Sequence, residues 1–251
     1  MLRSFKELKN YVLEAIDGEI GRCKDFLFDE TEWIIRYMVA DTRKWLTGRK
    51  VLISPQSLYE PEWLWKRFPV HLNRQQIKGS PPLEMDRPVS RQYETRWSDY
   101  YGLPGYWLGP GGGGTIYHPA EGIESPAANS PRAPQESKAD DSRLRSVNEA
   151  IGYRIEASDG EIGQVKDFFA DDQAWTLNYI MVDTGNWLPG RKVLVSPQWA
   201  DTVSLPERKV FFELSKEKIK KSPEYNPAEP PDRKYEDLLY SYYGFPPYWK
   251  T

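Results

Sequence analysis

The sequence is poor in the residues that most often carry catalysis and metal binding. It has one cysteine and two histidines in 251 residues. The single Cys23 excludes an intrachain disulfide framework and fits a reducing compartment. It aligns with Val165 in the repeat that the chain contains, so we expect a buried thiol rather than a nucleophile. His71 and His118 do not occupy equivalent positions, which argues against a histidine triad or a histidine metal site.

An excess of one charge and long apolar runs are also absent. Lys and Arg number 34 against 37 Asp and Glu, a net charge of -3, which gives no overall attraction to nucleic acid or anionic lipid. The lysines of residues 216–221 are most simply a solvated helix face. No window reaches the roughly 20 apolar residues that span a bilayer, and charges occupy the first residues, where an export signal is apolar. We expect a cytoplasmic protein that is not inserted into a membrane. Peripheral docking on a membrane surface remains possible.

What the chain does contain is an internal repeat with a constant offset of 142 residues. The motif Asp-Gly-Glu-Ile-Gly begins at Asp17 and again at Asp159, and Lys-Asp-Phe begins at Lys24 and again at Lys166. Residues 45–56 and 187–198 are identical at ten of twelve positions. Such a duplication predicts two copies of one domain.

The repeat sets the domain boundaries. We expect a first domain at 1–80 with an aromatic tail at 81–107, and a second domain at 144–222 with a tail at 223–251. Residues 108–143 between them are rich in Gly, Pro, Ala and Ser. This composition cannot bury enough apolar area to fold, so it predicts a flexible linker. The two copies can pack together as a pseudo-dimer.

Within a copy, short apolar runs alternate with turn signals. In the first copy the pattern predicts strands at 11–16, 20–28, 33–41, 50–54 and near Val70, joined as antiparallel hairpins. The Asp17-Gly18 pair predicts a tight turn. In the third strand, the apolar face of Tyr37 is expected to point inward and Arg36 outward, with Tyr179 and Asn178 in the same roles in the second copy.

Helix signals follow the last strand of each copy. Asn73 and Ser215 can each cap a short helix that ends before a proline. The tails begin with helix-like segments at Arg91 and Arg233 and end in a Tyr-Trp pair.

The combined motifs resemble the PRC-barrel family. They are Asp-Gly-Glu-Ile-Gly, Lys-Asp-Phe, Val-Asp-Thr at 182–184, Trp-Leu-Pro-Gly-Arg-Lys-Val-Leu-Val-Ser-Pro from Trp187, and Tyr-Tyr-Gly-Phe-Pro-Pro-Tyr-Trp from Tyr242. This family includes the cytoplasmic domain of the photosynthetic reaction centre H subunit and the C-terminal domain of the ribosome maturation factor. The resemblance implies a mostly β fold of two small antiparallel β-barrels, each with a short helix and an aromatic tail. It also implies a role in docking onto larger assemblies.

Several acidic residues recur at equivalent positions in both copies. The sequence shows no general base, nucleophile or set of metal ligands beside them. We expect Asp41 and Asp183 to brace the following turn by accepting hydrogen bonds from the backbone or from Arg49 and Arg191. Shared carboxylates can also serve hydrolysis or metal chemistry. Because no partner residues for that chemistry are visible, we interpret them as structural and expect no catalytic residue, metal or cofactor.

The tails hold the most distinctive residues, and two interpretations of them stay open. Large aromatic side chains either pack on a barrel that needs apolar cover or bind a protein partner. The residues concerned are Tyr100, Tyr101, Tyr106, Trp107, Tyr242, Tyr243, Tyr248 and Trp249.

The sequence therefore favours a non-enzymatic protein-binding adaptor or regulatory scaffold. One alternative is an accessory protein, like the H subunit, that docks on a membrane electron-transfer complex. The other is a hydrolase that uses the shared carboxylates. The charge balance argues against a nucleic-acid partner.

Overall fold

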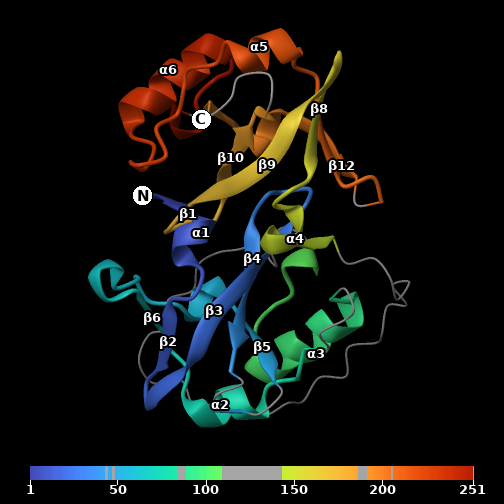
Figure 1. The fold of residues 1–251 in the computed structure, drawn as a ribbon. Helices are drawn as coiled ribbons and strands as arrows, with labels where there is room; N and C mark the ends of the chain where they lie inside the picture. Colours follow the sequence, from blue (N-terminus) through green and yellow to red (C-terminus); the bar gives the residue numbers. More distant parts are fainter. Residues whose placement is uncertain are drawn as a thin grey trace.

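The computed structural model describes residues 1–42, 45–46, 49–83, 89–108, 143–185, 191–204 and 206–250. The fold is mostly β, with two sheets and few helices (Figure 1). The expected linker at 108–143 lies outside these ranges except for its two end residues.

The first copy builds a six-stranded sheet in the order β5-β4-β3-β2-β6, with β7 paired to β3. The strands are β2 (Val12–Ala15), β3 (Gly18–Asp29), β4 (Ile35–Asp41), β5 (Lys50–Ile53), β6 (Arg67–Pro69) and β7 (Leu144–Ser146). The predicted strands of this copy all appear, and β6 ends one residue before Val70. The hairpin between β2 and β3 turns at Ile16 and Asp17, one residue earlier than predicted, because Gly18 already pairs with Ala15.

The second copy builds a seven-stranded sheet in the order β11-β10-β9-β8-β13-β12, with β1 paired to β9. The strands are β1 (Leu2–Ser4), β8 (Arg154–Ala157), β9 (Gly160–Asp171), β10 (Leu177–Asp183), β11 (Lys192–Val195), β12 (Ala200–Ser204) and β13 (Lys209–Phe212).

The expectation of purely antiparallel pairing was wrong at one place in each copy. β2 pairs with β6, and β8 with β13, in parallel. The last strand reaches β2 or β8 after a long connection rather than a hairpin, and this leaves its direction free to be parallel. Among the described strands, no pairing joins the two ends of either sheet.

The two copies exchange their first strands. β1 of the first copy pairs with β9 of the second, and β7, which opens the second copy, pairs with β3 of the first. Both exchanged strands have the sequence Leu-Arg-Ser. The Ile35 amide also donates to the Trp175 carbonyl at 2.8 Å, and the Leu177 amide donates to the Trp33 carbonyl at 2.7 Å. The seam between the copies is therefore built from reciprocal backbone pairing.

Helices are short except in the tails. They are α1 (Phe5–Leu8), α2 (Arg74–Gly79), α3 (Arg91–Tyr101), α4 (Val147–Ala150), α5 (Lys216–Lys220) and α6 (Arg233–Tyr243). Asn73 and Ser215 cap α2 and α5 as predicted, by accepting from the amides of Gln76 and Lys218. None of the helices in the described ranges is long and apolar enough to cross a bilayer.

The main core runs through both copies. Phe28 packs on Phe168, with ring centroids 5.9 Å apart, and Phe26 stacks on Trp175 at 5.7 Å. Apolar side chains contributed by both sheets thus form one continuous cluster across the seam. Because each copy buries apolar area against the other, the pair gains stability that neither copy has alone.

Both faces of β4 and β10 are buried, which corrects the expectation that Arg36 and Asn178 mark an exposed side. The Arg36 side chain is only 9% exposed and its guanidinium lies 4.1 Å from the Tyr106 ring centroid. Asn178 is 7% exposed. The tail of each copy packs on these strands, because Tyr37 meets Trp97 of α3 and Tyr179 donates to Glu236 of α6. Arg36 therefore lies beneath Tyr106 instead of in water.

Candidate functional site

The Lys-Asp-Phe motif of each copy holds the exchanged segment of the other. In β3, the Asp25 carboxylate accepts from the Ser146 hydroxyl at 2.5 Å and from the Asn148 amide at 3.0 Å. Asp167 accepts in the same way from the Ser4 hydroxyl at 2.5 Å and the Lys6 amide at 3.3 Å. Each aspartate therefore binds the start of the helix that follows an exchanged strand. Burial raises the pKa of both carboxyl groups, although these hydrogen bonds lower it.

A shift in strand register positions these aspartates. In the pairing of β3 with β4, Cys23 opposes Ala40 and Asp25 opposes Val39, so Lys24 is an extra residue in β3. An extra residue in a strand re-aims the side chains beside it. The sequence showed that Asp25 and Asp167 recur, but its period gave no signal that each contacts the opposite copy.

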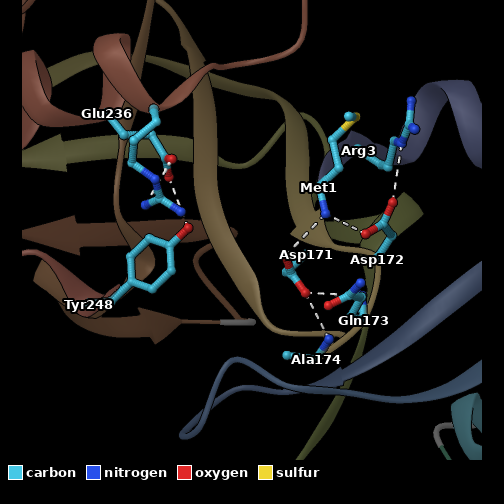
Figure 2. A network of polar contacts seen from close by, with 9 residues as sticks. Met1, Arg3, Asp171, Asp172, Gln173, Ala174, Glu236 and Tyr248 are labelled. Atoms are coloured by element: carbon cyan, nitrogen blue, oxygen red, sulfur yellow. Dashed lines mark hydrogen bonds and ion pairs between the residues drawn. The ribbon is translucent and has the colours of Figure 1, made fainter. Parts of the chain in front are cut away.

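The N-terminal strand makes polar contacts with the second copy, shown in Figure 2. The Met1 amino group lies between Asp171 and Asp172, and Arg3 Nε is 3.4 Å from Asp172 Oδ2. The Arg3 guanidinium also lies 3.7 Å from the ring centroid of Trp63. Arg3 thus links the second copy to the segment before β6.

Asp183 binds the backbone of the following turn, which is one of the two expected forms of the brace, and Arg191 donates elsewhere. Asp183 accepts from the Gly185 amide at 3.1 Å and from Lys192 Nζ at 2.6 Å. The Lys192 hydrogen bond is the main reason that the pKa of Asp183 is lowered. Arg191 instead donates to the Ser222 carbonyl at 2.6 Å, just beyond α5.

Arg49 has the same role as Arg191 in the first copy. It donates to the Lys78 carbonyl at 2.7 Å and to the Ser80 carbonyl. The carbonyls at the end of a short helix lack intrahelical donors, and an arginine satisfies them in both copies. Asp41 ends β4, paired with Lys50 of β5 in the backbone register.

The tail aromatics pack on their own copy. Trp97 of α3 donates from Nε1 to the Leu52 carbonyl at 3.1 Å and meets the Tyr37 ring edge-on at 4.9 Å. Tyr100 and Tyr242 donate their hydroxyls to the carbonyls of Gln76 and Lys218, at 2.7 and 2.8 Å. Each tail therefore spans from the sheet to the short helix of its copy.

The other candidate residues of the tails are also engaged. Tyr101 packs on Trp97 at 4.7 Å between ring centroids, and Tyr243 packs on Trp199 at 4.6 Å. The Arg91 guanidinium lies 4.2 Å from the Trp107 centroid, and that of Arg233 lies 3.9 Å from the Trp249 centroid. Of the eight tail aromatics, Tyr100 is the one counted among the exposed large apolar residues, at 43%.

A buried glutamate lies under each tail. Glu236 accepts from the hydroxyls of Tyr179 and Tyr248, at 2.8 and 2.9 Å, and Figure 2 shows Tyr248 beside it. Arg233 Nη1 is 3.1 Å from the same carboxylate.

In the first copy, Glu94 is fully buried and pairs with Arg91 Nη1 at 2.9 Å. Its burial raises its pKa to about 7, against the opposing effects of Arg91 and of the Tyr106 and Tyr37 hydroxyls. These glutamates lie within the fold, and the sequence analysis did not single them out.

Among the exposed large apolar residues, Leu64 and Trp65 lie side by side in sequence at the hairpin tip of the first copy. Leu64 and Trp65 are 93% and 73% exposed, while Trp63 is held at the base of the tip under Arg3. Tyr59, 49% exposed, stacks on His71 at the other end of the hairpin. Leu64 and Trp65 are called the aromatic tip below. Comparison of the two copies did not single out Trp65, because the residue 142 positions later is Glu207.

Little in the described ranges is arranged for metal or nucleophilic chemistry. Within them, no three His, Cys, Asp or Glu side chains gather closely enough to hold a metal ion. Cys23 is fully buried, and this burial raises the pKa of its thiol. Asp29 accepts from the amides of Thr31 and Glu32 and so closes a turn. His118 lies outside the described residues.

Comparison of the sequence with models of protein families and with curated proteins finds no match.

Proposed function

We propose that the chain is a tandem PRC-barrel protein that acts as a non-enzymatic, protein-binding adaptor or regulatory scaffold. Two observations support assignment to the PRC-barrel family. One is the repeated motif set, and the other is that both copies are mostly β with a short helix after the last strand. The recurring carboxylates support a non-enzymatic role, because Asp25, Asp167, Asp29 and Asp183 are engaged in structural hydrogen bonds.

The observation that carries the proposal is the aromatic tip. Leu64 and Trp65 are neighbours in sequence and both lie mostly in water, and contiguous exposed apolar surface marks interaction sites. Trp and Tyr are also the side chains that most often dominate binding energy at protein interfaces. The second copy carries Pro206 and Glu207 at the positions of Leu64 and Trp65, so its hairpin lacks this surface. One copy therefore supplies the docking surface, and the other supports it through Arg3 and the exchanged strands.

The base of the hairpin favours a defined docking surface. The Tyr59 amide donates to the Pro69 carbonyl at 3.0 Å, and the Glu62 amide donates to the Arg67 carbonyl at 2.9 Å. Trp63 is half-buried against Arg3 and meets the ring of Tyr11 edge-on, 6.3 Å away. Leu64 and Trp65 thus project from a supported loop, which reduces the entropy that binding must remove.

Photocrosslinking in the native cell tests the proposal. A photoreactive amino acid replaces Trp65 in one variant and Glu207, the exposed equivalent in the second copy, in a control. We expect the residue at position 65 to crosslink to a defined protein and the residue at 207 to give no such product. The double variant Leu64→Ser/Trp65→Ser should abolish capture of that protein while its circular dichroism stays that of the wild type.

Two outcomes would overturn the proposal. Equal crosslinking at 65 and 207 would show that the tip has no special role. Crosslinking at 65 to lipid alone would favour attachment to a membrane surface over a protein partner.

A further inference from the structure

A recess on the seam between the copies is separate from the aromatic tip. It lies between α1 and α4, above the register shift in β3, and has a volume of about 420 Å³. Sites for small molecules usually occupy about 300–1,000 Å³ and are lined by apolar groups with a few polar ones. Both copies contribute to its walls, so the recess exists only because the strands are exchanged.

The floor of the recess is apolar. Phe5, Cys23, Phe26 and Val147 line it and are themselves buried, and Ile151 is half-buried at its edge. Burial raises the pKa of the Cys23 thiol well above its usual value, which favours the neutral thiol. Such a floor favours an alkyl or aryl group over a fully hydrated ligand.

The rim is cationic. Lys6, Lys9 and Lys24 line the recess, and Lys9 Nζ donates to the neutral Asn148 Oδ1 at 2.9 Å. Within the part of the chain that the structure describes, these three ammonium groups form no ion pair, although the charge of Lys6 helps to lower the pKa of the Asp167 carboxyl group. Three cations gathered in this way, in a chain whose net charge is -3, form a local site for an anion.

The one carboxylate of the recess is already occupied. Asp25 accepts from the Ser146 hydroxyl and from the amides of Phe26 and Asn148. It is therefore committed to holding the exchanged segment rather than to pairing with Lys6 or Lys24.

The two sides of the recess differ. The repeat places Asn148 of α4 opposite Lys6 of α1, and Ile151, just after α4, opposite Lys9, just after α1. The cationic groups thus come from α1 and β3, and the opposite wall offers Val147 and Ile151. We infer that this recess binds a small amphipathic anion, a carboxylate whose medium-length alkyl or aryl body lies on the apolar floor while its charged end meets Lys6 and Lys24.

Calorimetric titration of the full chain with octanoate tests the inference, with octylamine as the probe of opposite charge. Octanoate should bind at one site, and octylamine should bind much more weakly. A hydrogen bond to a charged group corresponds to a change of about tenfold or more in affinity. Lys6→Gln/Lys24→Gln should therefore weaken octanoate binding by at least about tenfold.

Two further variants separate the site from a general effect of charge or folding. Lys166→Gln, the equivalent of Lys24 in the second copy, should leave octanoate affinity unchanged. Ile151→Trp should fill the recess and remove binding while the melting temperature stays near that of the wild type. The inference is wrong if octanoate and octylamine bind alike, if Lys6→Gln/Lys24→Gln binds as the wild type does, or if octanoate does not bind at millimolar concentration.

Discussion

At the scale of single residues, the last glycine of the Asp-Gly-Glu-Ile-Gly motif is required by a close approach of backbones. A Cβ at Gly21 would lie 2.1 Å from the Asp41 carbonyl oxygen, and the φ of Gly21 is +138°. A Cβ at Gly163 would lie equally close to the Asp183 carbonyl oxygen, at 2.1 Å. Both copies therefore keep glycine where β3 or β9 passes the end of the next strand.

Gly21→Ala should destabilise the protein by about 3 kcal/mol or more, because strain in φ adds to a clash with backbone that cannot move away. Gly102→Ala is the matched control, since Gly102 also has a positive φ, +65°, but has open space around it. It should cost only about 1 kcal/mol. Urea denaturation measures both, and equal losses would show that the close approach is unimportant.

Glu94 should make stability depend on pH. Its pKa is 4.5 in the reference state and about 7 when folded, so the folded protein retains a proton there that the unfolded chain releases. Stability should therefore fall as pH rises from about 4.5 to about 7 and stay level above that. The fall is at most about 3 kcal/mol.

Glu94→Gln, which cannot ionise, should remove this fall. Its melting temperature should rise relative to that of the wild type between about pH 5 and pH 8, as measured by differential scanning calorimetry. A constant difference across that range would contradict the assignment to Glu94.

At the scale of elements, the tail helices complete the sheets by covering their outer faces. In α6, Leu239 is fully buried while its neighbour Leu238 is 57% exposed. Leu239→Ala should cost about 2–5 kcal/mol of unfolding free energy, because it leaves a cavity in the main core. Leu238→Ala should change stability by less than about 0.5 kcal/mol. Similar effects of the two substitutions in urea denaturation would mean that the tail does not fold on its copy.

At the scale of the whole molecule, the exchanged strands and the shared core predict that the copies stay together without a covalent link. The test inserts a specific protease site within residues 109–142 and cleaves it in the folded protein. The two fragments should elute together in size-exclusion chromatography and separate only in denaturant, because β1 pairs with β9 and β7 with β3. Elution of two smaller, separate species in native buffer would show that the exchange does not hold the copies together.

The sequence by itself determined the duplication, the positions of the strands from β2 to β6 and the caps of the short helices, but not the strands β1, β7 and β12. These features depend on local rules: Asn73 binds an amide three residues away, and alternating apolar residues favour strands wherever they occur. The same rules placed the tail helices at Arg91 and Arg233. They also suggested buried tail aromatics, because the two sheets need apolar cover.

Only the tertiary structure decided which sheet each first strand joins. Leu2–Ser4 and Leu144–Ser146 have the same sequence, so local preference is equal for either partner, and the choice depends on contacts between residues far apart in the chain. Because of that choice, Asp25 accepts a hydrogen bond from Ser146, and the Arg3 guanidinium lies over the Trp63 ring. The same choice creates the recess lined by Lys6 and Lys24. The exposure of Leu64 and Trp65 is decided in the same way, because an apolar residue is buried only where another part of the fold covers it.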